Sequence, residues 1–190
     1  MKRGGMNIAN RLTVMRILLV PAFVTSLLYS SPRRPYFHAV AVSVYLLACI
    51  TDGIDGYLAR KLHQKTKFGS YMDPLADKLL LISGYLSLSL MPNIPEAMRV
   101  PAWVTIIVIS RDVVIVAGSV IIFLITGRFK VRTLFIGKLT TVVQMAALFS
   151  ALLWLSPTLS MTLYFLAAAL TLFSAYFYIR SGSRELRGHA

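Results

Sequence analysis

The chain has 190 residues, of which 57% are hydrophobic and only 14% are charged, and its formal net charge is +13. This composition is too apolar for an ordinary soluble domain, because about 25% of the residues in such domains are charged. A large positive charge would suit a nucleic-acid-binding protein, but in so apolar a chain it favours anionic lipid headgroups, and no nucleic acid is expected as a partner.

Six hydrophobic segments follow one another along the chain, each near the roughly 20 residues that a helix needs to cross a bilayer. They cover residues 12–30, 36–58, 68–91, 101–125, 134–155 and 158–179. The sequence therefore predicts an all-α, polytopic integral membrane protein with six transmembrane helices, surrounded by membrane lipids. A single membrane domain is expected over residues 1–190.

The basic residues indicate the orientation of these helices, because cytoplasmic loops carry an excess of lysine and arginine. Most of them lie near the N-terminus, in the second and fourth loops, and in the C-terminal tail: Lys2, Arg3, Arg11, Arg60, Lys61, Lys65, Lys67, Arg128, Lys130, Arg132, Arg180, Arg184 and Arg187. The opposite side has only Arg33, Arg34 and Arg99. Both termini are therefore expected on the cytoplasmic side of the cell inner (cytoplasmic) membrane.

Four of the seven acidic residues lie close together, as Asp52, Asp55, Asp73 and Asp77. Spacings of three and four residues place each pair on one face of a helix. Carboxylates cost several kcal/mol where water is scarce unless cations compensate them, and oxygen ligands suit Mg²⁺ or Mn²⁺. Two such ions can clamp phosphate oxygens during an in-line displacement. The spacing therefore predicts a two-metal site for phosphoryl transfer, facing the cytoplasm.

Neighbouring residues fit the same chemistry. Arg60 lies one turn beyond the first acidic pair and can pair with a diphosphate. Gly56 and Ala59 leave room for a substrate to approach the helix. A carboxylate near the metals could also take a proton from an attacking hydroxyl. The residues alone thus indicate metal-dependent phosphoryl transfer on a lipid and leave the substrate open.

Polar residues also interrupt the fourth and fifth hydrophobic segments. Arg111 is followed by Asp112, which is consistent with a structural ion pair within the membrane. Lys138, Thr141 and Gln144 share a helical face, and beside the carboxylate cluster this stripe predicts a lined cavity rather than polar contacts that only join helices. We expect Arg111 and Lys138 to bind the phosphate of an acceptor substrate.

The acidic run resembles the signature of the CDP-alcohol phosphatidyltransferases. Written from Asp52 to Asp77, it reads D-x2-D-G-x2-A-R-x8-G-x3-D-x3-D. The opening Asn10-x2-Thr13-x2-Arg16 is similar to the start of the same family. With the six-helix pattern, the resemblance covers essentially the whole chain.

The resemblance implies a homodimer that uses two Mg²⁺ or Mn²⁺ ions to transfer a phosphatidyl group from CDP-diacylglycerol to an alcohol, releasing CMP. It implies that the four aspartates hold the metals and that Asp77 is also the catalytic base. Lys78 is a competing candidate on chemical grounds, because a deprotonated lysine could also accept the proton. The residues that would contact the CDP-lipid are Asn10, Thr13, Gly56, Ala59, Arg60, Thr66 and Gly69.

Three hypotheses remain for the function. The Asn10 start, the segment around Asp77 and the one around Lys138 are similar to bacterial phosphatidylglycerophosphate synthases of this family, whose acceptor is glycerol 3-phosphate. Arg111-Asp112 is more similar to the cardiolipin synthases, whose acceptor is phosphatidylglycerol. From another class, a divalent-cation transporter would also explain four intramembrane aspartates, but it would not explain Arg60.

Overall fold

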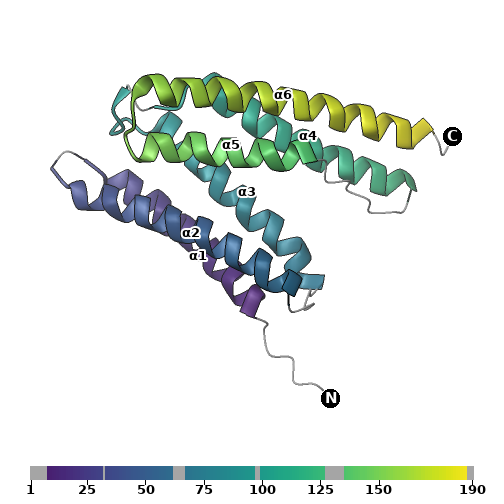
Figure 1. The fold of residues 1–190 in the computed structure, drawn as a ribbon, viewed down its shortest axis with the longest axis horizontal. Helices are drawn as coiled ribbons and strands as arrows, with labels where there is room; N and C mark the ends of the chain where they lie inside the picture. Colours follow the sequence, from purple (N-terminus) through teal and green to yellow (C-terminus); the bar gives the residue numbers. More distant parts are fainter. Residues whose placement is uncertain (1–7, 32, 62–66, 97–98, 127–134, 188–190) are drawn as a thin grey trace, which may run out of the picture. The chain divides into compact units, whose positions relative to one another are not determined.

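The computed structural model describes residues 8–31, 33–61, 67–96, 99–126 and 135–187. For residues 8–12, 52–61, 67–74, 77, 119–123, 125–126, 135 and 181–187, the description is limited to the backbone. The described residues form six helices and no strand (Figure 1). These are α1 (Ile8–Tyr29), α2 (Pro35–Lys61), α3 (Lys67–Leu90), α4 (Ala102–Thr126), α5 (Phe135–Leu152) and α6 (Pro157–Arg187).

Proline marks the beginning of three of these helices. Pro35 and Pro157 are the first residues of α2 and α6, and Pro101 directly precedes α4. The fixed φ of proline fits a first helical turn, where its missing N–H would have no partner within the helix. The Ser156 hydroxyl also accepts the Leu159 N–H at 3.2 Å, which caps the start of α6.

One described stretch is long and apolar enough to cross a membrane, namely Pro157–Arg180 in α6, with a mean hydropathy of 1.6. Shorter apolar helical stretches cover Thr13–Tyr29, Pro35–Thr51, Lys78–Leu90 and Ile136–Leu152 within the described residues. Within the described residues, the predicted all-α fold and its six helices are confirmed. That all six cross a bilayer stays a prediction.

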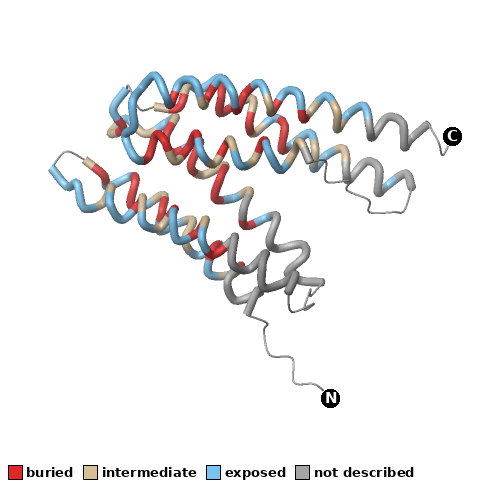
Figure 2. Tube along the Cα trace, viewed as in Figure 1, coloured by how far each residue is buried: buried red, intermediate tan, exposed pale blue. Residues whose placement is uncertain are grey.

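The chain divides into two compact units, Met1–Pro95 and Glu96–Ala190. In the first unit, α1 packs against both α2 and α3. Figure 2 shows buried residues along both α1 and α2. The core contains fully buried side chains such as Phe23 of α1 and Tyr45 of α2, whose ring centroids are 5.7 Å apart. Close packing of these large side chains against one another stabilises the unit.

The side chain of Asn93, which follows α3, forms hydrogen bonds with the C-terminal end of α1. Asn93 donates hydrogen bonds from Nδ2 to the carbonyl oxygens of Leu27, at 2.7 Å, and Ser30, at 2.6 Å. The last carbonyls of a helix have no partner within it, so an amide from elsewhere satisfies them. The contact joins residues more than 60 positions apart.

In the second unit, α6 packs against both α4 and α5. Apolar side chains form most of its core, and buried polar pairs join α5 to α6. Ser150 donates to Ser160 at 3.1 Å, and Gln144 donates from Nε2 to Thr171 at 2.8 Å. Such interhelical hydrogen bonds satisfy polar groups that would otherwise be buried without a partner.

Candidate functional site

The predicted metal ligands lie on the helices of the first unit. The backbone of α2 is helical through Asp52, Asp55, Gly56, Ala59 and Arg60, and the backbone of α3 is helical through Gly69, Asp73 and Asp77. Helical geometry therefore applies to the spacing of both sets. The side chains of all these residues, that of Asn10, and the whole of Thr66 lie outside the described residues. Their contacts to metal and CDP-lipid stay predictions.

The predicted metal site rests on the carboxylate oxygens of the four aspartates and on their helical spacing in α2 and α3. Carboxylate oxygens at these positions are the ligands that Mg²⁺ and Mn²⁺ prefer. Among the side chains that the structure describes, no three histidine, cysteine or acidic residues gather to form an additional metal site.

Two polar residues of α1 lie entirely inside the first unit. Thr13 and Arg16 have no exposed surface, and Arg16 is among the largest fully buried side chains described. A buried guanidinium is stable only with partners that compensate its charge. Since α1 packs against α2 and α3, which carry the aspartates, Arg16 lies in the unit where negative charge is concentrated.

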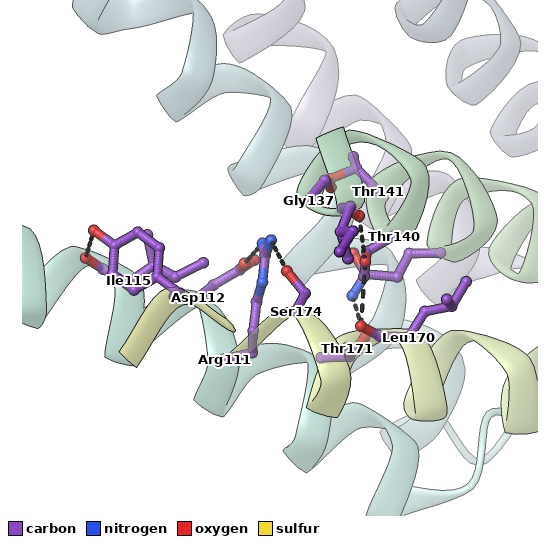
Figure 3. Close-up of polar contacts among 12 residues, drawn as sticks. Arg111, Asp112, Ile115, Gly137, Thr140, Thr141, Leu170, Thr171 and Ser174 are labelled. Carbon is purple, nitrogen blue, oxygen red and sulfur yellow. Dashed lines mark hydrogen bonds and ion pairs between the residues drawn. The ribbon is translucent and has the colours of Figure 1, made fainter. Parts of the chain in front are cut away.

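The predicted ion pair of α4 is present. The Arg111 guanidinium donates from Nη1 to the Asp112 carboxylate at 2.8 Å, and both side chains are buried (Figure 3). From Nη2 it donates to the Ser174 hydroxyl of α6 at 3.1 Å. The guanidinium is therefore held by groups from two helices.

The first turn of α5 lies directly against this guanidinium. A Cβ atom built at Gly137 would lie 3.2 Å from Arg111 Nη2 and 3.9 Å from Ser174 Oγ. Lys138 follows Gly137 and is exposed. The structure thus places Arg111 beside the start of α5, where Lys138 was predicted to act with it.

The polar stripe of α5 divides into two parts. Gln144 is fully buried and donates to Thr171 of α6, and Thr140 donates to the carbonyl oxygens of Ile136 and Leu170. These contacts agree with the alternative of polar contacts between helices, and the predicted lined cavity stays a prediction. Thr141 is partly exposed and Lys138 is exposed, so the accessible part of the stripe lies near the N-terminus of α5.

Sequence reasoning did not identify two residues of this cluster, Thr171 and Ser174 of α6. They are three residues apart and therefore share a helical face. That spacing within an apolar helix was the available signal. Their partners lie on α4 and α5, and no sequence spacing reveals such contacts.

Comparison with known proteins decides the family. The family model described as CDP-alcohol phosphatidyltransferase matches residues 6–173, which include the acidic run and most of both units. The chain belongs to the CDP-alcohol phosphatidyltransferase family. This confirms the resemblance, and it favours an enzyme over a cation transporter.

Similar curated proteins agree in their names. A probable phosphatidylglycerophosphate synthase of Mycobacterium tuberculosis is 32% identical over 185 residues, which cover 96% of this chain and 84% of that protein. A CDP-diacylglycerol–glycerol-3-phosphate 3-phosphatidyltransferase of Haemophilus influenzae is 33% identical, over 95% of both chains. The protein of that name from Escherichia coli K12 is 32% identical, over 95% of this chain and 97% of its own.

Proposed function

We propose that this protein transfers the phosphatidyl group of CDP-diacylglycerol to glycerol 3-phosphate, forming phosphatidylglycerophosphate and releasing CMP. The observation that carries the proposal is the similarity to relatives named for this reaction, at 32–33% identity over at least 95% of the chain. The family signature from Asp52 to Asp77 supports the same chemistry.

The reaction requires a proton acceptor and a site for negative charge. An acceptor hydroxyl oxygen forms a bond to the phosphatidyl phosphorus, the bond from that phosphorus to the CMP oxygen breaks, and the hydroxyl proton passes to Asp77. Asp52, Asp55, Asp73 and Asp77 would hold two Mg²⁺ or Mn²⁺ ions. When bound, these ions would supply positive charge to the oxygens of the transferring group.

The CDP-lipid is assigned to the first unit. Arg60 is suited to the diphosphate because its guanidinium can donate paired hydrogen bonds to phosphate oxygens. Gly56, Ala59 and Gly69 are small and allow close approach to the helix backbone. We assign the remaining contacts to Asn10, Thr13 and Thr66.

The acceptor phosphate is assigned to Arg111 and Lys138 of the second unit. The position of the Arg111 guanidinium beside the first turn of α5 supports this assignment. Asp112 pairs with Arg111, and an aspartate can fulfil that role with either acceptor. The Arg111-Asp112 sequence therefore gives no preference to phosphatidylglycerol, and the names of the relatives favour glycerol 3-phosphate.

We further propose that the protein is a homodimer in the cell inner membrane, with six membrane-spanning helices and an active site that faces the cytoplasm. The apolar stretch Pro157–Arg180 supports the membrane location, the distribution of basic residues supports the orientation, and the family resemblance implies the homodimer. One membrane domain would then include both units.

Purified protein in detergent tests the proposal directly. It is incubated with CDP-diacylglycerol, Mg²⁺ and either glycerol 3-phosphate or phosphatidylglycerol, and the lipid products and CMP are measured. We expect phosphatidylglycerophosphate and CMP in equal amounts with glycerol 3-phosphate. Cardiolipin as the main product would replace the proposal with its alternative, and the absence of CMP with either acceptor would overturn it.

A further inference from the structure

We propose that Ser174 is a positioning residue for the acceptor, which together with Asp112 orients the Arg111 guanidinium toward the acceptor phosphate. The inference rests on the proposed function and adds a residue of α6 to it. Neither the family signature nor the basic residues of α4 and α5 indicate this role.

The guanidinium is fixed by two contacts on two different nitrogens. Asp112, on the same helix, accepts from Nη1 at 2.8 Å, and Ser174, on α6, accepts from Nη2 at 3.1 Å (Figure 3). Either contact alone would allow the planar group to rotate about the remaining hydrogen bond. Together they define its plane, and a defined plane is what paired hydrogen bonds to a phosphate require.

The Arg111 guanidinium still has N–H groups that could donate to a ligand. A guanidinium has five N–H donors, and Asp112 and Ser174 each accept one of them. Nε is buried and has no hydrogen-bond partner within the described part of the chain. Arg111 as a whole is only 8% exposed, so this donor lies where water is scarce and an anionic oxygen would satisfy it.

Positive charge accumulates at the same place. The first turn of α5 carries the partial positive charge of a helix N-terminus, and Gly137 in that turn permits its close approach to Nη2. Lys138 follows Gly137 along α5, and its side chain is exposed. Asp112 compensates one unit of this charge, and the remainder favours an anion such as a phosphate.

Ser174 therefore acts on the acceptor through Arg111, and its removal has a selective effect. In Ser174→Ala the guanidinium loses the contact that orients Nη2. We expect the KM for glycerol 3-phosphate to rise about fivefold to tenfold, in the range for the net contribution of one ordinary hydrogen bond, because Ser174 acts on the acceptor only through Arg111. The KM for CDP-diacylglycerol and the unfolding temperature should stay close to those of the wild-type protein.

Ser160→Ala is the matched control. Ser160 also lies on α6, is also buried, and has an interhelical hydrogen bond of the same length, 3.1 Å, but its partner is Ser150 rather than a charged group. It should leave both KM values unchanged. Gly137→Ala is the second test variant, because the added methyl presses on the same guanidinium nitrogen, and it should raise the KM for glycerol 3-phosphate selectively.

Steady-state kinetics with each substrate varied in turn distinguish the outcomes. Equal changes in both KM values, no change in Ser174→Ala, or the same change in Ser160→Ala overturns the positioning role. If Ser174→Ala does not fold, Gly137→Ala decides by the same criterion. A wild-type protein that forms no product from glycerol 3-phosphate overturns the proposed function and this inference together, whereas an active wild type with an unselective Ser174→Ala overturns this inference alone.

Discussion

At the scale of single residues, replacing an aspartate by asparagine removes a charge and keeps the shape, so it isolates metal binding. We expect Asp52→Asn, Asp55→Asn and Asp73→Asn each to lower turnover at least about 10³-fold, which corresponds to ~4 kcal/mol of transition-state stabilisation. The measurement is CMP release at saturating CDP-diacylglycerol and Mg²⁺. Variants that retain near-native rates in excess EDTA would contradict the two-metal proposal.

Asp77 differs from the other three aspartates because we propose that it accepts the proton of the acceptor hydroxyl as well as binding a metal ion. Asp77→Asn should slow the chemical step about 10²–10⁴-fold, the usual contribution of general base catalysis, while CDP-diacylglycerol still binds with Mg²⁺. Single-turnover rates and nucleotide-lipid binding are measured side by side on Asp77→Asn and Lys78→Met. A slower chemical step only in Lys78→Met would assign the base to the lysine.

Lys138 is exposed, unlike its buried neighbour in the cluster, Arg111. Because its side chain is exposed, its loss should weaken binding of the acceptor rather than folding. Lys138→Ala should raise the apparent KM for glycerol 3-phosphate at least about tenfold, as expected for a charge-assisted contact, and leave that for CDP-diacylglycerol unchanged. If the two constants moved together, Lys138 would have no specific role in the acceptor site.

At the scale of elements, the end of α1 depends on one side chain from outside the helix. Asn93→Ala leaves the carbonyls of Leu27 and Ser30 without its two hydrogen bonds, at a cost of about 1–3 kcal/mol. The unfolding temperature in detergent should fall by about 2–4 °C for each kcal/mol in a chain of this size.

Ser43→Ala provides the comparison for this prediction. Ser43 is exposed on α2, and its hydroxyl donates to the carbonyl of Ala39 within the same helix at 2.8 Å. Its loss should leave the unfolding temperature almost unchanged, because the Ala39 carbonyl lies within the helix and can retain its backbone bond. Equal effects of the two variants would show that the Asn93 contact does not stabilise the end of α1.

The sequence predicted the helices well because each apolar segment has the length of one helix. The predicted and observed helices differ at their ends, because polar residues can extend a helix beyond its apolar segment. α6 was expected to end near Ile179 but continues to Arg187, since polar residues such as Glu185 are also good helix formers. α5 ends at Leu152, a few residues earlier than expected, and a turn with a positive φ at Trp154 leads into Ser156 and α6.

The candidate site was predictable only where residues form a pattern along the chain. The aspartates repeat at helical spacing, and Arg111 and Asp112 are adjacent, so both features could be recognised in the sequence. Ser174 lies 63 positions from the residue that it contacts, and a serine in an apolar helix usually bonds to its own backbone. Only the packing of α4 against α6 reveals this partnership.

At the scale of the whole molecule, the described parts expose many large apolar side chains. On α6 alone, Phe165 is 63% exposed and Leu172 is 58% exposed. Water would disfavour such a surface, whereas hydrocarbon would not. The exposure therefore agrees with the proposed membrane location, and detergent would have to cover this surface in the purified protein.

The close approach of Gly137 to Arg111 also constrains how this protein can evolve. A larger residue at position 137 brings its Cβ to 3.2 Å from Nη2, so the guanidinium must shift by a few tenths of an ångström, and shortening position 111 would remove both this contact and the positive charge. Neither exchange is favourable alone: the first disturbs a side chain in use, and the second leaves Asp112 buried without its cation. A descendant that gives up Arg111 to accept an uncharged alcohol would therefore have to change position 112 with it, and position 137 would then no longer be limited by the guanidinium.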